Sequence, residues 1–419
     1  MLMLLPAAVP ADWYTNHRTG TNNALVPIAD QAIDYSAPSW LTTAGHTITA
    51  GRPIVVGNQL LVVGEATGAV RIKKFHAATG TFLGESPDLA APLFSSYSTP
   101  TVDVNIAKVF FGSGNVVYCL DLDTLAIDWS TPLTNANTTP SGAGYQILNG
   151  SVALGGSRVF VSTYDSSFTA AQSQLVALNA TTGAVEWFAL PGGYGSYGPS
   201  YFFQPGFELV IVPGSTGGGS TGTGYLRAYQ ASTGALEWSS NTLTVDPWTL
   251  SRQIWTDVTI LGTTGFAVTY DFSAASTQLV SFDPTNGRAD WIVPALSSDC
   301  PPVLAGSAVH VFGGSYSSPE LAAYALIDGA ELWKVSIPGS AFRNYMAATF
   351  DSIYLVSGGN VQRRSLVNGS LTGGTAGGGF ADSPLTIDGL GGVYTLDNAF
   401  RVAGFGLTIP VELSTWGLE

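Results

Sequence analysis

Few residues of this chain are of the types that carry out chemistry, and they are scattered. The side chains most often used as metal ligands or nucleophiles are four histidines and two cysteines: His17, His46, His76, His310, Cys119 and Cys300. The histidines have none of the spacings that are typical of a metal site, and no His-x-x-x-His pair occurs. We therefore expect structural or incidental roles for them.

One glycine-rich segment, Gly217–Gly222, matches the Gly-x-Gly-x-x-Gly pattern of dinucleotide-binding proteins. Such a site needs a strand before the glycines and a helix after them, because the helix N-terminus holds the phosphate. Here the residues that follow, Tyr225–Tyr229, have the composition of another strand. We interpret the segment as a loop.

The strongest pattern in the chain is a repeat, and it determines how any site must be positioned. Five times a short apolar strand leads into a tight turn in which Gly, or the residue in its place, is followed four positions later by Trp. These anchors are Trp129, Trp187, Trp238, Trp291 and Trp333. The turn pairs Thr-Gly, Asn-Gly and Asp-Gly supply the positive φ of a tight hairpin, so each Trp lies just inside the next strand and can pack against the neighbouring unit.

Weaker copies extend the repeat in both directions. Phe75–Phe82 and Arg364–Leu371 have the turn without the Trp, and Gly392–Asn398 begins a last unit that the chain cannot complete by itself. The segment Ala37–Thr43, with Trp40 as a sixth anchor, can supply its missing outer strand. The sequence therefore predicts an all-β fold: an eight-bladed β-propeller of four-stranded antiparallel blades, closed by strands from both termini. The 50 glycines, the 23 prolines and the charged fraction of only 11% agree with a chain rich in tight turns.

The element Ala-Leu-x-x-x-Thr-Gly-x-x-x-Trp resembles the tryptophan-docking repeat of pyrroloquinoline-quinone-type (PQQ-like) β-propellers. This family includes quinoprotein alcohol dehydrogenases and the outer-membrane β-barrel assembly lipoprotein. The segment Asp12–Asn22 is also similar to the start of many extracytoplasmic members. The resemblance covers about residues 12 to 405 and implies the propeller fold, but the family contains both enzymes and non-catalytic scaffolds.

The resemblance directs attention to the ring axis, where the first strands of the blades converge. The residues just before those strands are Arg52, Tyr97, Asn149, Tyr197, Arg252, Trp255, Asp257, Asp299, Arg343, Asn344 and Asp382. In the quinoproteins this mouth holds the quinone, with Ca²⁺ on carboxylate and amide oxygens, a carboxylate base, an Arg and a stacking Trp.

By that resemblance the candidate residues fall into three sets. The candidate metal ligands are Asn149, Asp257 and Asp299, and the candidate catalytic residues are Asp299 and Arg343. The candidate cofactor contacts are Arg52, Asn149, Arg252, Trp255 and Asp257.

Two departures argue against a PQQ enzyme. The adjacent Cys-Cys pair of the alcohol dehydrogenase branch is missing, and so is the haem attachment motif Cys-x-x-Cys-His. Polar residues are also expected at a propeller axis without any ligand. We therefore favour a non-enzymatic binding or scaffold propeller without a cofactor. The alternatives are a PQQ- and Ca²⁺-dependent dehydrogenase of an alcohol or sugar, and a carbohydrate-binding or carbohydrate-active propeller.

Charge and surface composition limit the classes of partner that this protein is expected to bind. A formal net charge of −14 argues against nucleic acid as a partner. We interpret the one basic cluster, Arg71–Lys74, as part of a solvated outer face. The aromatic stretches Tyr194–Phe203 and Asp246–Trp255 are either contact surface for a protein or glycan partner or buried blade edges. We expect a monomer.

The N-terminus bears on localisation. Met1–Ala11 is apolar and ends in a small-x-small pattern, so it is a possible signal-peptide remnant, and residues 12–419 form a single propeller domain. No run of about 20 apolar residues predicts a membrane-spanning segment. We expect an extracytoplasmic or secreted protein, periplasmic or extracellular. Cys119 and Cys300 fall in units on opposite sides of the ring, so both should be free thiols.

Overall fold

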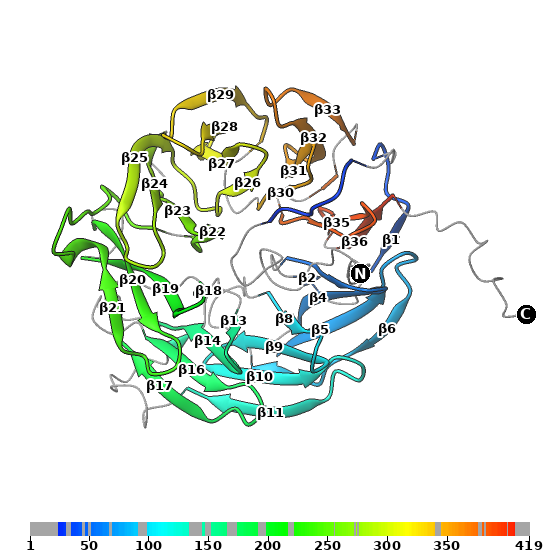
Figure 1. The fold of residues 1–419 in the computed structure, drawn as a ribbon. Helices are drawn as coiled ribbons and strands as arrows, with labels where there is room; N and C mark the ends of the chain where they lie inside the picture. The colour runs from blue at the N-terminus through cyan, green and yellow to red at the C-terminus, as the bar shows by residue number, and fades with distance from the viewer. Residues whose placement is uncertain are drawn as a thin grey trace, which may run out of the picture.

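The computed structural model is a closed ring of eight blades, which follow one another in chain order (Figure 1). The residues that it describes are 24–30, 35–43, 47–48, 52–66, 69–90, 99–133, 145–146, 152–165, 174–191, 198–216, 222–254, 256–271, 274, 276–339, 345–375, 379–380, 383–399 and 401–406. The possible signal-peptide remnant lies outside these residues.

Each blade is a four-stranded antiparallel sheet that extends from the axis to the rim of the ring. From the axis outward, blades 1 and 2 are β3 (Ile54–Val56), β4 (Gln59–Ala66), β5 (Ala69–His76), β6 (Phe82–Glu85), and β8 (Thr101–Asp103), β9 (Lys108–Ser113), β10 (Val116–Asp121), β11 (Ile127–Pro132). Blades 3 and 4 are β13 (Ala153–Gly155), β14 (Arg158–Ser162), β16 (Leu175–Asn179), β17 (Val185–Ala189), and β18 (Ser200–Gln204), β19 (Phe207–Ser215), β20 (Gly224–Gln230), β21 (Leu236–Ser239).

The second half of the ring repeats this arrangement. Blades 5 and 6 are β22 (Thr259–Leu261), β23 (Thr264–Val268), β24 (Ser276–Phe282), β25 (Ala289–Leu296), and β26 (Val303–Ala305), β27 (Ala308–Ser315), β28 (Ser318–Ala325), β29 (Glu331–Ser336). Blades 7 and 8 are β30 (Ala347–Ala348), β31 (Ser352–Ser357), β32 (Asn360–Ser365), β33 (Leu371–Gly374), and β34 (Thr386–Ile387), β35 (Val393–Leu396), β36 (Val402–Phe405), β1 (Trp40–Thr42).

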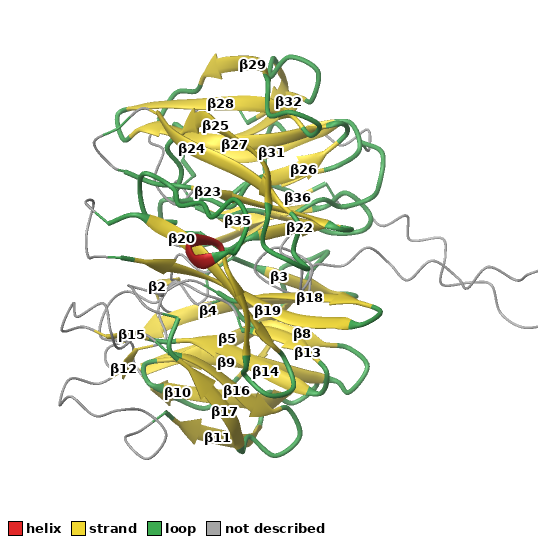
Figure 2. Cartoon of the chain, turned by 60° about the vertical axis from the view of Figure 1, so that its left-hand side comes forward, coloured by secondary structure: helices red, strands yellow, loops and turns green. Residues whose placement is uncertain are grey.

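Four short strands and one helical turn complete the described structure. The strands β2 (Thr47–Ile48) and β7 (Leu89–Ala90) extend blade 1, and β12 (Tyr145–Gln146) pairs with β15 (Tyr164–Asp165). The 3-10 helix Ser240–Thr242 is the red turn in Figure 2. Among the described residues no helix is long and apolar enough to cross a membrane.

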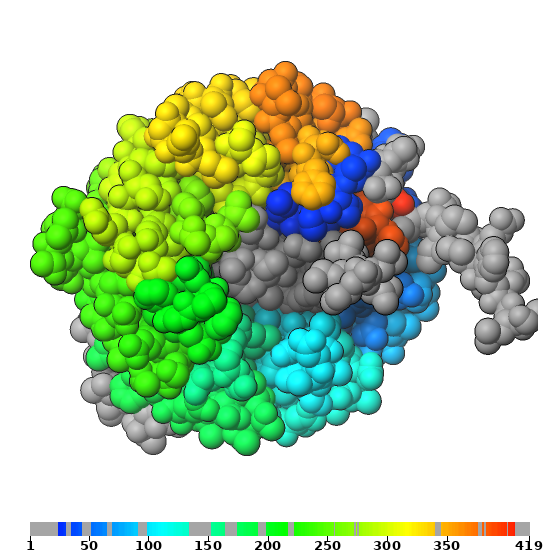
Figure 3. Space-filling view, in the orientation of Figure 1, coloured from blue at the N-terminus to red at the C-terminus, as the bar shows by residue number. Residues whose placement is uncertain are grey.

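The N-terminal segment closes the ring, as the sequence predicts. Strand β1 pairs antiparallel with β36, with Trp40 opposite Gly404, and so becomes the outer strand of blade 8. Before reaching it, the chain runs parallel to β30, where Val26 N donates to Ala348 O at 2.7 Å and Ala348 N to Ala24 O at 2.9 Å. Figure 3 shows these N-terminal atoms in blue against the orange atoms of blade 7.

Trp anchors join neighbouring blades at six of the eight blade junctions, which confirms their predicted role. Trp187 is typical: its Nε1 donates to Ala231 O of blade 4 at 2.9 Å, and its ring lies on Gly234, whose φ is +70°. A Cβ at Gly234 would lie 2.6 Å from Cε3 of the indole, so only Gly fits beneath it. The same contacts, at 2.9–3.1 Å, are made by Trp40 with Ala77, Trp129 with Ala180, Trp238 with Pro284, Trp291 with Leu326 and Trp333 with Leu366.

The basic cluster of blade 1 is not a solvated face, contrary to the sequence interpretation. Lys73 and Lys74 are buried. Lys73 pairs with Glu85 at 3.1 Å, and Lys74 Nζ donates to the backbone carbonyls of Leu122 and Asp123 in blade 2. The cluster was misread because its partners lie on another strand and another blade. A basic side chain therefore joins blade 1 to blade 2 where the Trp is missing.

Hydroxyl groups near the axis tie neighbouring blades together and so fix the positions of the first strands. The Ser or Thr at the start of an innermost strand donates to a backbone carbonyl of the following blade. The described pairs are Thr101 with Val152, Ser200 with Val258, Thr259 with Pro302 and Thr386 with Pro53. The residues that precede these strands are thereby held at the mouth of the ring.

Candidate functional site

Arg52 crosses the mouth of the ring just before β3. Its side chain is 1% exposed. Its backbone N–H donates to Thr99 Oγ1 at 3.0 Å, its Nη2 donates to Met346 O of blade 7 at 3.1 Å, and its Cζ lies 5.2 Å from the centre of the Tyr345 ring. Burial lowers the pKa of Arg52 to about 9, although Tyr345, Cys300 and Asp257 act in the opposite direction. At neutral pH the guanidinium of Arg52 is therefore charged.

Two of the predicted carboxylates reach the same region. Asp257 precedes β22, Asp299 precedes β26, and both are buried. Asp299 Oδ1 lies 3.5 Å from the thiol of Cys300. Burial raises the pKa of Tyr270, and the negative charge of Asp299 is the next largest cause of this increase. Arg52, Asp257, Asp299, Cys300 and Tyr270 thus form one electrostatic cluster, which we call the axial cluster.

The other predicted site residues do not all belong to this cluster. Arg252 is partly exposed, and its Nε binds Asp271 at 2.8 Å, so it pairs at the edge of the mouth. The remaining predicted residues lie outside the described part of the chain: Tyr97, Asn149, Tyr197, Trp255, Arg343, Asn344 and Asp382.

The calcium–quinone site implied by the resemblance falls only partly within the described residues, since Asn149, Trp255 and Arg343 lie outside them. Among the described residues no three His, Cys, Asp or Glu side chains come together in a way that could hold a metal ion. The guanidinium of Arg52 interacts electrostatically with Asp257 and also donates to a backbone carbonyl. A buried carboxylate needs such a cation, and here the chain itself supplies it.

The sequence analysis missed Tyr270 and Tyr345. Tyr270 follows β23 and not a first strand, so the rule that located the other mouth residues could not find it. Tyr345 directly precedes Met346, and the same rule should have included it. An aromatic residue one or two positions before a first strand was the available signal.

A second surface lies at the opposite ends of the innermost strands, and we call it the lower face. Every blade has the same strand order, so the turns between first and second strands and those between third and fourth strands all lie on this face. Eight large apolar side chains are exposed in these turns or in the strand residues next to them: Val104, Ile106, Phe203, Leu261, Ile327, Phe350, Val367 and Leu390. Phe203, Val367 and Ile327 are 67%, 83% and 88% exposed.

The two stretches singled out for their aromatic content differ from one another. In the described part of the first, Phe203 is exposed on the lower face while Phe202 is buried. In the second, Trp248 is buried, and its Nε1 donates to Gly287 O at 2.8 Å. Phe203 of the first stretch is therefore exposed surface, and Trp248 of the second stretch belongs to a buried blade edge.

Both cysteines are free and buried, as expected. Cys119 lies in β10 of blade 2, where burial raises the pKa of its thiol to about 12, and Cys300 lies before blade 6. A raised thiol pKa suppresses the thiolate, so Cys119 is unsuited to nucleophilic chemistry. His310 is also buried, 5.7 Å from the Trp333 ring, in a structural position.

Three solved structures share the fold over most of their length. The quinohemoprotein alcohol dehydrogenase of Comamonas testosteroni aligns with a TM-score of 0.71, at 12% identity over 94% of this chain and 80% of that chain. The quinohemoprotein alcohol dehydrogenase ADHIIG of Pseudomonas putida HK5 gives 0.69, at 13% identity over 95% and 80%. BamB of Moraxella catarrhalis gives 0.59, at 16% identity over 88% and 99%.

Sequence comparison agrees with the structural similarity. No curated protein matches the sequence significantly. The family model described as "Outer membrane protein assembly factor BamB" matches residues 32–200 and 210–370, which is well over half of the chain. The chain therefore belongs to the PQQ-like, BamB-type β-propeller family.

Proposed function

We propose that this propeller is a non-enzymatic, extracytoplasmic binding module that holds a protein partner on its lower face. The observation that supports this most is the set of eight apolar side chains exposed on the turns of that face. Leaving apolar surface in water is costly, and proteins expose patches of it mainly at interaction sites.

The way these side chains are held also favours binding. Each lies in a short turn between paired strands or at the strand end next to it, and neighbouring sheets are joined by Trp anchors and hydroxyl bonds. A surface that is already ordered loses little conformational entropy when a partner binds. Aromatic anchors such as Phe203 and Phe350 supply the large contact area of interface hot spots.

The axial cluster supports a structural role for the mouth. Arg52, Asp257 and Asp299 are buried. In this proposal Arg52 and Asp257 stabilise each other where the eight blades converge, and neither PQQ nor Ca²⁺ is needed.

Site-specific photo-crosslinking tests the lower face. A benzophenone amino acid at Phe350 or Leu390 should give one discrete adduct in the cells that make the protein. The matched control is Leu332, which is 52% exposed on an outer strand of the ring and should give none. Equal adducts from all three positions, or none from any, would contradict a specific partner on the lower face.

Cofactor addition tests the competing dehydrogenase. PQQ with Ca²⁺ should leave the melting temperature unchanged and give no dye-linked oxidation of alcohols or sugars, whereas a ligand at 100 times its Kd stabilises by about 2.7 kcal/mol. Stabilisation with turnover, both lost in Asp299→Ala and Arg343→Ala, would establish the dehydrogenase instead.

A further inference from the structure

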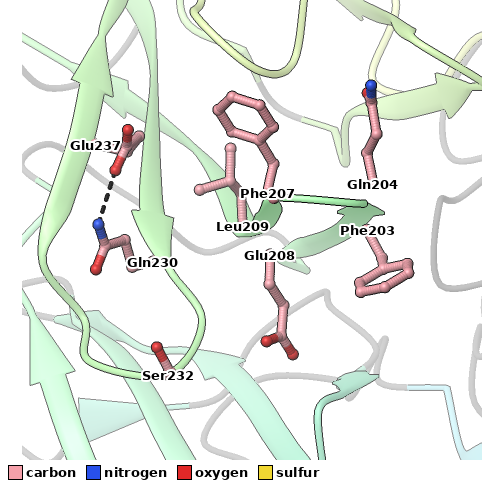
Figure 4. Close-up of a pocket in the computed structure, with 9 residues that line it drawn as sticks. Phe203, Gln204, Phe207, Glu208, Leu209, Gln230, Ser232 and Glu237 are labelled. Carbon is pink, nitrogen blue, oxygen red and sulfur yellow. Dashed lines mark hydrogen bonds between the residues drawn. The ribbon is translucent and has the colours of Figure 1, made fainter.

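A hollow of about 400 Å³ opens beside Phe203 on the lower side of blade 4. Its walls come from the β18–β19 hairpin and from the turn between β20 and β21. In Figure 4, Phe207 and Gln204 project to one side of the hairpin, while Phe203 and Glu208 project to the other. The strand register agrees, since Gln204 pairs with Phe207 and Leu209 with Gln230.

Comparison with blades 2 and 3 shows how blade 4 differs from them. In blades 2 and 3 the residue before the Trp anchor is acidic, and the first residues of the second strand supply its cation. Lys108 Nζ lies 2.7 Å from Asp128, and Arg158 Nε lies 2.6 Å from Glu186. Blade 4 keeps the carboxylate as Glu237. The register position of Lys108 and Arg158, however, is occupied by a leucine.

The register identifies that leucine without ambiguity. Lys108 pairs with Asp121 and Arg158 with Asn179, in each case two residues after the partner of the Trp. The equivalent residue of blade 4 is Gln230, which pairs with Leu209. Among the described residues no Lys, Arg or His lies within ion-pair distance of Glu237 or Glu208. Blade 4 therefore has the carboxylate of this arrangement without its cation.

The polar atoms around the hollow are mostly acceptors. Gln230 Nε2 donates to Glu237 Oε2 at 2.9 Å, and Gln230 Oε1 accepts from Thr233, so this amide is fixed and one of its two N–H donors is already in use. The Oε1 atom of Gln204 is buried and has no donor among the described residues. A buried acceptor of this kind favours a ligand that brings an N–H group.

We propose that this hollow binds a basic side chain, arginine or lysine, of the protein partner. This inference rests on the function proposed above, because it assigns a contact within the same face. The cation would take the place that Lys108 and Arg158 occupy in blades 2 and 3, opposite Glu237. The ring of Phe207, which projects to the same side of the sheet as Leu209 and Gln230, would contact its aliphatic stem and, through cation–π attraction, its charged end.

Titration with a minimal probe tests this directly. N-acetyl-arginine amide should bind weakly to the full chain by saturation-transfer NMR, and N-acetyl-citrulline amide, which has the same shape without the charge, should bind at least about fivefold more weakly. The variant Glu237→Gln should weaken arginine binding about fivefold, and Phe207→Ala should also weaken it. Glu186→Gln, at the same position of blade 3 but already paired with Arg158, should leave it unchanged.

Several results would overturn the inference. Equal binding of citrulline would indicate a neutral hydrogen-bonding ligand such as a saccharide. Unchanged arginine binding in Glu237→Gln, or an equal loss in Glu186→Gln, would place the cation elsewhere. If no binding occurs while the crosslinks from Phe350 and Leu390 persist, only this inference fails. If arginine binds but the crosslinks are absent, only the proposed partner face fails.

Discussion

Replacing Gly234 by Ala should place a methyl group against the indole of Trp187. The new Cβ would lie 2.6 Å from Cε3 and 2.7 Å from Cδ2, well inside van der Waals contact. The indole can escape only by moving away from Ala231 O, to which it donates at 2.9 Å. We therefore expect loss of packing and of a hydrogen bond at the junction of blades 3 and 4.

The size of the effect follows from three contributions. A non-glycine residue at φ +70° costs about 1 kcal/mol, overpacking about 1–3 kcal/mol and the weakened hydrogen bond about 1 kcal/mol. The matched control is Gly262→Ala, because Gly262 has φ +59° but no atom within 4 Å of its added Cβ. This control should therefore cost only the first contribution.

Thermal unfolding followed by near-ultraviolet circular dichroism measures the difference. With an unfolding entropy of roughly 2.1 cal/mol/K per residue, the 419 residues give roughly 0.9 kcal/mol/K, so each kcal/mol lowers the midpoint by about 1 °C. Gly234→Ala should melt about 2–4 °C below Gly262→Ala. Equal midpoints for the two variants would show that the indole does not occupy the space above Gly234.

Three other changes test separate features of the ring. Lys74→Met should cost about 1–3 kcal/mol in thermal unfolding, because the carbonyl of Leu122 loses a donor; an unchanged midpoint would contradict the blade 1–2 contact. Burial lowers the pKa of His310 to about 4, below its value of about 6.5 in the unfolded chain. The unfolded state then binds more protons between these values, so stability should fall by up to about 1.4 kcal/mol per pH unit as the pH drops from 6.5 to 4, and less steeply in His310→Phe. Removing residues 1–43 should abolish cooperative unfolding, since blade 8 loses β1; a truncated chain that melts like the full one would refute the closure.

The fold could be predicted because its determinants are local in the sequence. The turn glycine and the Trp four residues later are visible together, and the structure uses them at the two junctions of the blade: Gly183 lies under Trp129 of the preceding blade, and Trp187 lies on Gly234 of the following blade. The closing role of Trp40 was also predictable, because the last unit lacked one strand and the first segment offered one. Strand bounds followed from alternation and turn residues, since both are properties of neighbouring positions.

The candidate site was harder to predict from the sequence than the fold, because its contacts join residues that are far apart in the chain. The sequence predicted that Arg52 lies at the mouth. It did not predict the acceptor of Arg52, Met346 O, because the two residues are 294 positions apart in the chain. The hollow of blade 4 was missed altogether. Its only sequence signal is the substitution of Leu209 for Lys108 and Arg158, and it becomes visible only once the three second strands are aligned.

The two junctions without Trp show what the fold requires at this position. Opposite Trp187 in the strand pair stands Ala177, and opposite Trp333 stands Ala323. In blade 1 the Trp position is Gly84, opposite Lys74, and in blade 7 it is Gly373, opposite Arg363. In these two blades the large side chain thus comes from the third strand and not from the fourth, so the side-chain volume at the junction is conserved.

In blade 1 the exchange also conserves hydrogen bonding. Lys74 donates to Leu122 O, three residues before Leu125, just as Trp129 donates to Ala180 O, three residues before Gly183. With no indole above it, the turn of blade 2 accepts Leu125 at φ +57° in place of Gly. A large side chain from either of two adjacent strands can therefore occupy this position, and in blade 1 it also donates to the turn carbonyl of the next blade. A search for Trp alone therefore undercounts the blades.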